Sequence, residues 1–223
     1  MQLHLASLTN ALIETQRQNK ALKAGRTPEI VVKLLNAVRE AGLEQHFLVV
    51  GTHALYAYET AAGVRIVPSA LATQDVDLLW DARKRVQFVI DLRRDASSML
   101  ALLQRVDPSF RRKSDTGQNE SAVNDKGFEV DFLRRECGES DPHPFRFSED
   151  EEDLWPVFAH PVISATGKLA TMRTVSPQTF VEFKRWMAEH AQHREPVKRR
   201  RDLHQAQIVQ ALLDEGLLMA ECV

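Results

Sequence analysis

The chain has 223 residues, of which 43% are hydrophobic and 27% are charged, so it can bury the core of one large domain or two small ones. Its formal net charge of -2 argues against a strong nonspecific attraction to nucleic acid or to an anionic membrane. Cys137 and Cys222 are the only cysteines. Because they are far apart in the sequence, we expect neither a disulfide framework nor a zinc site. The first residues lack the pattern of a secretory signal, and no run of about 18 apolar residues could span a membrane. These features predict a cytoplasmic protein with no membrane partner.

Two helices are predicted at the start of the chain. Residues 4–24 have the composition of a polar helix. A second helix should follow Thr27, which is expected to act as its N-cap, with Pro28 in the first turn. Gly42 should end that helix. Its apolar residues recur at helical spacing: Ile30, Val31, Leu34, Leu35 and Val38.

The next segment predicts a strand, a turn and a helix in close succession. Residues 47–50 form an apolar strand pattern, and a glycine-containing turn leads into a helix near Thr52. A loop containing Pro68 should then lead to a second strand at residues 75–80. Residues 82–105 predict a long helix.

Strands dominate the region from residue 107 to residue 135, and its last segment, residues 128–133, alternates apolar and acidic side chains. An acidic, proline-containing loop is expected at 136–153. Two further strands should flank a turn at Thr166 and Gly167, and two helices, at 177–193 and 196–214, should end the chain.

This order predicts an α+β fold, in which a mixed sheet is flanked by helices. We expect three parts: N-terminal helices at 1–44, an α/β core at 45–175 and a helical C-terminal region at 176–223.

Asp75 and Asp77 lie one residue apart in the strand pattern TQDVDLLWD. Alternate side chains of a strand share a face, so both carboxylates should project together while Val76 and Leu78 enter the core. Two such charges repel each other unless they share a proton or bind a cation. Mg²⁺ prefers oxygen ligands and commonly binds one or two carboxylates together with substrate phosphates.

Asp131 is a third acid on a predicted strand, between Val130 and Phe132. If this strand lies beside the strand of Asp75 and Asp77, the three carboxylates converge. Such a set suits a site for two metal ions roughly 3.5–4 Å apart, which can activate a hydroxyl and stabilise a leaving phosphate.

Gly51 and Thr52 stand between the first predicted strand and its helix. The N-terminus of a helix offers free N–H groups and partial positive charge, which can hold a phosphate. The same pattern also arises from ordinary helix capping, so both interpretations stay open at this point.

Two other motifs, an EF-hand loop and a phosphate loop, are excluded because required residues are absent. An EF-hand loop that began at Asp75 would need an oxygen ligand at Leu79 and a glycine at Trp80. A phosphate loop around Lys168 would need a glycine at Val162. His53 is interpreted as a residue at the start of a helix rather than a ligand.

The order of these motifs resembles the nucleotidyltransferase fold of the DNA polymerase beta-like superfamily. In that family a hydrophobic residue precedes Gly and then Gly or Ser, an acid-x-acid pair follows on the next strand, and a lone acid lies on a later one. Here the pattern reads VGT at 50–52, DVD at 75–77 and then Asp131. The segments GTHALYAYETAAG and TQDVDLL are most similar to an uncharacterised bacterial group of such proteins. The resemblance covers about residues 45–214.

The resemblance implies a nucleotidyltransferase-like sheet, and roles for six residues. Asp75 and Asp77 would bind magnesium, and Asp131 would complete the metal site and help to deprotonate the attacking hydroxyl. Gly51 and Thr52 would contact the triphosphate, and Lys184 matches a position from which such proteins often reach the nucleotide's phosphates. Thr52 replaces the commoner Ser or Gly, and the gap from Gly51 to Asp75 is longer than in minimal members. Both departures bear on the phosphate contacts more than on the metal site.

The resemblance therefore predicts magnesium-dependent transfer of a nucleotidyl group from a nucleoside triphosphate, such as ATP, to a hydroxyl of RNA, a protein or a small molecule. Two alternatives use the same fold without turnover. One is a nucleotide-binding module, and the other is an antitoxin-type or regulatory protein with a protein partner.

Overall fold

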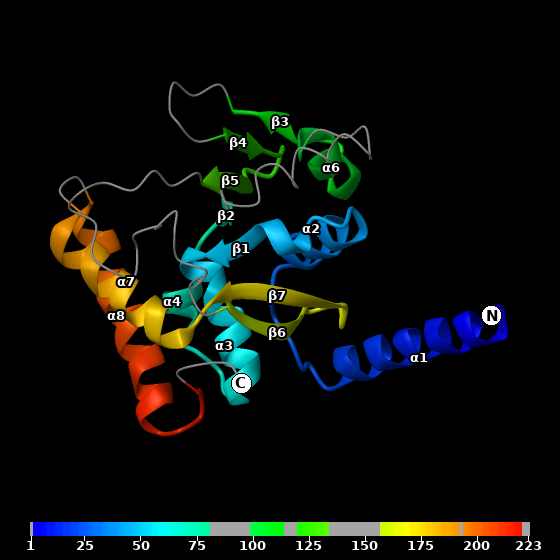
Figure 1. Ribbon diagram of the computed structural model, residues 1–223, viewed down its shortest axis with the longest axis horizontal. Coiled ribbons are helices and arrows are strands. Elements are labelled where there is room, and N and C mark those ends of the chain that lie inside the picture. The colour runs from blue at the N-terminus through cyan, green and yellow to red at the C-terminus, as the bar shows by residue number, and fades with distance from the viewer. Residues whose placement is uncertain (1, 81–98, 114–119, 134–156, 192–193, 220–223) are drawn as a thin grey trace, which may run out of the picture.

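The computed structural model describes residues 2–80, 99–113, 120–133, 157–191 and 194–219. The predicted acidic loop at 136–153 lies outside the described residues, as does most of the helix predicted at 82–105. Within the described ranges, helices and strands are mixed along the chain, and the predicted α+β class is confirmed (Figure 1).

A mixed seven-stranded sheet, in the order β3-β4-β5-β2-β1-β7-β6, forms the centre of the described structure (Figure 1). Its strands are β1 (Phe47–Val50), β2 (Asp75–Trp80), β3 (Arg111–Arg112), β4 (Glu120–Val123), β5 (Glu129–Leu133), β6 (Val157–Ile163) and β7 (Leu169–Val175). The pairs β2–β5 and β1–β7 are parallel, and the other neighbours are antiparallel. The strands predicted at 47–50 and 75–80 are thus confirmed and lie side by side.

Helices surround this sheet. They are α1 (Gln2–Ala21), α2 (Glu29–Glu40), α3 (Ala54–Ala62), α4 (Pro68–Leu71), α6 (Met99–Val106), α7 (Pro177–His190) and α8 (Pro196–Asp214), and two short 3-10 turns are η1 (Glu44–His46) and η2 (Gly51–His53). In Figure 1, α7 and α8 pack together at one end of the sheet, and α1 projects away from the rest of the described chain. None of the described helices is both long and apolar enough to cross a membrane.

Helix α2 forms because its apolar residues recur at helical spacing, and Val31, Leu34 and Val38 bury that stripe. Leu35 and Val38 line one cavity together with Leu78 of β2, so α2 covers the face of the sheet to which Leu78 points. Because strand side chains alternate, Asp75 and Asp77 project from the opposite face.

Helix α3 is held against the sheet by Tyr58. The Tyr58 ring has edge-to-face contacts with Phe158 and Phe180, each with 5.4 Å between ring centroids. Its hydroxyl donates a 2.7 Å hydrogen bond to the carbonyl oxygen of Val175 at the end of β7. Helix α3 therefore follows β1 closely and fixes the turn between them.

The structure differs from two local predictions. Thr27 does not cap α2; it is buried, donates its backbone N–H to Ile163 O at 3.0 Å, and forms a parallel bridge with Ser164. Pro28 stands at the N-cap instead. The predicted loop at Pro68 contains the short helix α4, because proline fits the first turn of a helix.

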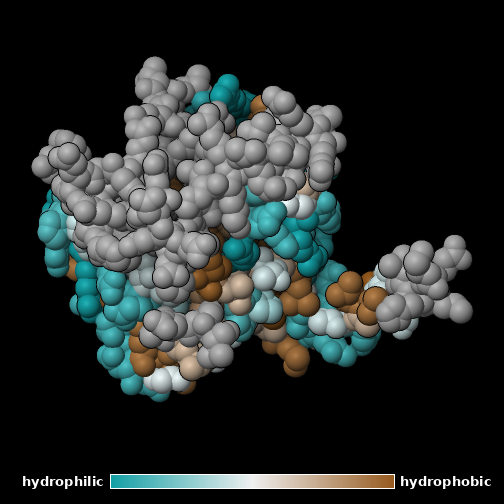
Figure 2. Space-filling view, viewed as in Figure 1, coloured by the Kyte–Doolittle hydropathy of each residue, from teal (hydrophilic) through white to brown (hydrophobic). Residues whose placement is uncertain are grey.

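Helix α1 is joined to the rest of the chain near its C-terminal end. Gln16 and Asn19 donate side-chain hydrogen bonds to the carbonyls of Thr166 and Gly167 in the turn between β6 and β7. Nearer the N-terminus, Leu8 and Leu12 are 50% and 64% exposed, and Figure 2 shows hydrophobic residues on this projecting helix. The division of the chain at residues 44 and 175 stays a prediction.

Replacement of Tyr58 by Phe tests the anchoring of α3. The substitution keeps the ring contacts but leaves the buried carbonyl of Val175 without the hydroxyl donor, so the free energy of unfolding should fall by about 1–2 kcal/mol. Urea unfolding measures this loss. Tyr56→Phe on the same helix is the matched control, and an equal loss in both variants would contradict the assigned role of the Tyr58 hydroxyl.

Candidate active site

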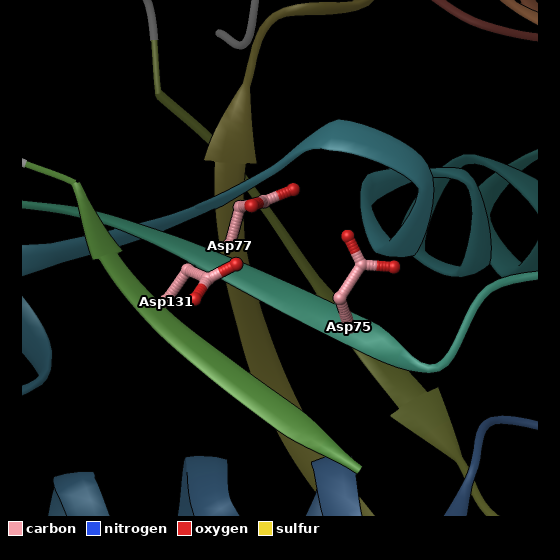
Figure 3. Close-up of side chains that lie close together, drawn as sticks. All are labelled: Asp75, Asp77 and Asp131. Carbon is pink, nitrogen blue, oxygen red and sulfur yellow. The ribbon is translucent and has the colours of Figure 1, made fainter. Parts of the chain in front are cut away.

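Three carboxylates meet on one face of the sheet, at the parallel pair β2–β5. Asp77 lies directly opposite Asp131 in the register of the two strands, and Asp75 lies two residues earlier on β2. One oxygen of each carboxylate lies within 4.8 Å of the others. Figure 3 shows all three side chains projecting from the same side of the strands. The convergence expected from the sequence is therefore present in the fold.

The environment of the cluster raises the proton affinity of Asp77. Burial raises the pKa of Asp77 to about 6, and the charges of Asp75 and Asp131 add to this effect. Lys184 and Arg194 act in the opposite direction. A divalent cation would remove the repulsion, and three carboxylates form the oxygen donor set that suits Mg²⁺.

Thr73 orients one of the carboxylates. Its hydroxyl donates a hydrogen bond to Asp75 Oδ1, which leaves the other oxygen of that carboxylate free of this contact. Hydrogen bonds of this kind hold metal-binding carboxylates in a fixed orientation. Thr73 was not among the residues predicted from the sequence, although it lies only two residues before Asp75.

Gly51 brings the backbone of the turn η2 against Asp77. Val50 pairs with Asp77 across β1 and β2, so the next residue enters the turn directly above this carboxylate. Gly51 has φ +70°, and a Cβ atom at this position would lie 2.5 Å from Asp77 Oδ2. Both the conformation and the close approach require glycine.

Thr52 follows in the same turn and is only 6% exposed. Its Oγ1 accepts a 3.1 Å hydrogen bond from Gln205 Nε2 of α8. Gln205 was not among the residues predicted from the sequence, because no local pattern relates a glutamine of the last helix to a turn near residue 52.

Lys184 lies in a buried cluster of charges between α7 and α8. Its Nζ is 2.9 Å from Asp202 Oδ1, and Arg194 binds the other oxygen of Asp202. Burial lowers the pKa of Lys184, and the charge of Asp202 opposes this effect. Lys184 therefore lies within electrostatic range of Asp77 but is paired with Asp202, and its predicted contact with phosphate stays a prediction.

His53 completes the turn and is buried. Its ring lies against Tyr56 and Phe128, with centroid distances of 5.7 and 6.2 Å. Burial lowers the pKa of His53 to about 4, against the opposing charge of Asp75, so the ring is neutral at pH 7. This placement agrees with its interpretation as a residue at the helix start.

Comparison with known proteins gives one family match. A family model described as nucleotidyltransferase matches residues 29–222. No curated protein matches the chain in sequence. Among solved structures, the solution structure of the antibiotic-resistance factor ANT(2'')-Ia aligns with a TM-score of 0.42 and 13% identity, over 84% of this chain and 91% of that one.

The first prediction for the site concerns Gly51→Ala, with Gly63→Ala as the matched control. Both glycines have a positive φ, +70° and +66°, but a Cβ at Gly63 meets nothing within 4 Å. Each variant should lose about 1–2 kcal/mol of stability from backbone strain. Only Gly51→Ala should also displace Asp77 and weaken Mn²⁺ binding by about tenfold or more, measured by electron paramagnetic resonance. Equal Mn²⁺ affinity in the two variants would contradict the role given to this close approach.

Asp77→Asn should stabilise the metal-free protein at neutral pH. The folded pKa of about 6 lies above the ordinary value of 3.8, so between these values the folded state binds more protons than the unfolded chain. The free energy of unfolding contributed by Asp77 therefore falls as pH rises through this window. Above pH 6 the variant should exceed the wild type by roughly 1–3 kcal/mol, and this advantage should shrink toward about pH 4.

Urea unfolding in EDTA, at about pH 4.5 and about pH 7.5, measures this difference. Asp125→Asn, at an exposed position between β4 and β5, is the control. Its stability relative to the wild type should not rise between the lower and the higher pH. A variant less stable than the wild type at the higher pH would show that the Asp77 charge is not repelled in the folded protein.

Proposed function

Because this chain belongs to the nucleotidyltransferase family, we propose that it uses Mg²⁺ to transfer a nucleotidyl group from a nucleoside triphosphate to a hydroxyl acceptor. The family match extends over residues 29–222, which includes the sheet from β1 onward and both C-terminal helices. The observation that carries the proposal is the convergence of three carboxylates beneath a glycine turn.

Asp75, Asp77 and Asp131 are the residues that would hold Mg²⁺, as one ion or two. The donor set fits, since all three ligands are carboxylate oxygens and their mutual repulsion calls for positive charge. When bound, the metal supplies charge compensation for the triphosphate and for the developing oxyanion.

Asp131 is the residue we assign to the acceptor's proton. It lies on β5, at the edge of the cluster away from the turn η2, and its side chain is partly exposed. Its carboxylate accepts the proton of the acceptor hydroxyl while that oxygen attacks the α-phosphorus. The bond between the α-phosphorus and the bridging oxygen breaks, and pyrophosphate leaves with the bonding electron pair.

Gly51 and Thr52 are assigned to the triphosphate. The turn η2 runs directly into α3, and Gly51 lies against Asp77. The N-terminal end of a helix offers free N–H groups and partial positive charge, which can hold a phosphate. Lys184 and Arg194 add positive potential, as their influence on the pKa of Asp77 indicates. We therefore assign the phosphates to the neighbourhood of the turn η2, within the field of these two basic side chains.

The test is label transfer from nucleoside triphosphates. The purified protein is incubated with Mg²⁺ and each triphosphate in turn, labelled at either the α- or the γ-phosphate, with and without cell extract. Nucleotidyl transfer places the α-label on the acceptor and leaves the γ-label in pyrophosphate. The nature of the labelled product, RNA, protein or small molecule, then identifies the acceptor class.

If this carboxylate takes the proton, Asp131→Asn should lower the rate of transfer at least about a hundredfold. Asp125→Asn is the matched control and should retain the wild-type rate. Transfer that persists in EDTA, or in Asp131→Asn, would contradict the proposed mechanism. Nucleotide binding without any transfer would favour the binding-module or antitoxin-type alternative of the same fold.

A further inference from the structure

Gln205 connects three separate parts of the site through one buried amide. The side chain is 0% exposed and extends from α8 toward the turn η2 and the helix α4. Its Nε2 donates one hydrogen bond to Thr52 Oγ1 at 3.1 Å and another to the carbonyl oxygen of Ala70 at 2.6 Å. Ala70 lies in α4, which leads into the strand of Asp75 and Asp77.

The carbonyl of Ala70 fixes which end of the Gln205 amide faces Thr52. A backbone carbonyl can only accept hydrogen bonds, so the amide nitrogen and not the amide oxygen must point toward it. The same nitrogen then has its second hydrogen available for Thr52. The amide oxygen of Gln205 is left without a partner among the described residues, although buried polar atoms are normally paired. The hydrogen bond to Ala70 therefore selects this orientation of the Gln205 amide, although it leaves the amide oxygen without a partner among the described residues.

The orientation of the amide in turn fixes the polarity of the Thr52 hydroxyl. A hydroxyl has one hydrogen to donate and two lone pairs that accept. Because Gln205 occupies a lone pair of Oγ1, the hydroxyl hydrogen remains free for another acceptor. Within the ranges that the structure describes, no residue accepts this hydrogen. Thr52 is thus left as a donor beside Gly51, the residue that contacts Asp77.

A second residue of α8 strengthens the same connection. Arg201 lies one helical turn before Gln205 and donates a 3.0 Å hydrogen bond to the carbonyl oxygen of Ala72. The two side chains therefore bind the carbonyls of Ala70 and Ala72, in the segment that leads into β2. This arrangement keeps α8, the turn η2 and the start of β2 in one fixed relation.

We propose that Gln205 is a positioning residue, which directs the Thr52 hydroxyl so that it donates to a phosphate oxygen of the bound nucleotide. The inference rests on the proposed function, because it assigns the turn η2 to the triphosphate. An ionised glutamate at position 205 would have nearly the same shape but could only accept. It would take the Thr52 hydrogen for itself and face the carbonyl of Ala70 with a second acceptor.

The experiment measures binding of α,β-methylene-ATP in the presence of Mg²⁺ by calorimetry. The methylene bridge cannot be cleaved in the transfer reaction, so binding is recorded without turnover. Thr52→Val and Gln205→Glu should each weaken binding by about tenfold or more, the effect of one hydrogen bond to a charged group. Thr52→Ser should bind as the wild type does, because it keeps the hydroxyl. Gln207→Glu, at an exposed position of the same helix, is the matched control and should also be unchanged.

The double variant Thr52→Val/Gln205→Glu distinguishes positioning from a separate structural effect. If Gln205 acts through the Thr52 hydroxyl, the double variant binds no more weakly than either single variant. Losses that multiply, or wild-type affinity in Gln205→Glu, would overturn the inference. Gln205→Met introduces no charge and serves as the second variant if Gln205→Glu fails to fold. The double variant Thr52→Val/Gln205→Met should bind the analogue no more weakly than Thr52→Val alone.

Two further readouts separate this inference from the proposed function. Mn²⁺ affinity should be the same in all these variants, since none of them alters a carboxylate of the cluster. A wild-type protein that does not bind the analogue would overturn the proposed function together with the inference. A wild-type protein that binds it, with Thr52→Val equally tight, would overturn only the role of Thr52 and Gln205.

Discussion

Repulsion between carboxylates is the constraint around which the rest of this structure is organised. The parallel register of β2 and β5 sets Asp77 opposite Asp131, and burial makes the negative charges harder to sustain. Hydrophobic side chains on the other face, such as Val76 and Val130, hold the strands in that register despite the repulsion. The fold therefore holds together negative charges that repel one another, a repulsion that a bound cation would relieve.

The C-terminal helices contribute to this balance from a distance. Asp202 is fully buried, and it keeps Lys184 and Arg194 close enough to lower the pKa of Asp77. An ion pair of this kind gains little stability, because desolvation offsets the attraction, but the loss of one partner would leave a buried charge uncompensated. The cluster thus makes the packing of α7 on α8 and the potential at the carboxylates dependent on the same residues.

The features that depend on neighbouring residues in the sequence could be predicted from it. Period-two alternation located Asp75, Asp77 and Asp131 on strands, and the glycine turn after residue 50 was recognised from its place between a strand and a helix. The sequence could not indicate that Thr27 would pair with Ser164, because that bridge joins segments far apart along the chain. It also could not relate Gln205 to Thr52, or Lys184 to Asp202, since those contacts depend on how whole helices pack. Thr73 was within reach, as it lies two residues before Asp75, just outside β2.

The contact between Gln205 and Thr52 joins residues that are 153 positions apart in the sequence. Contacts of such long range form late, because the chain must first close a large loop. During synthesis, α3 and β2 leave the ribosome long before α8 exists, and domains of this size often pass through partly packed intermediates. A nascent chain would therefore hold its acidic strands in place before the turn above them acquires its final hydrogen bond. The maturation of the site is in this way timed by the synthesis of α8, well after that of the strands.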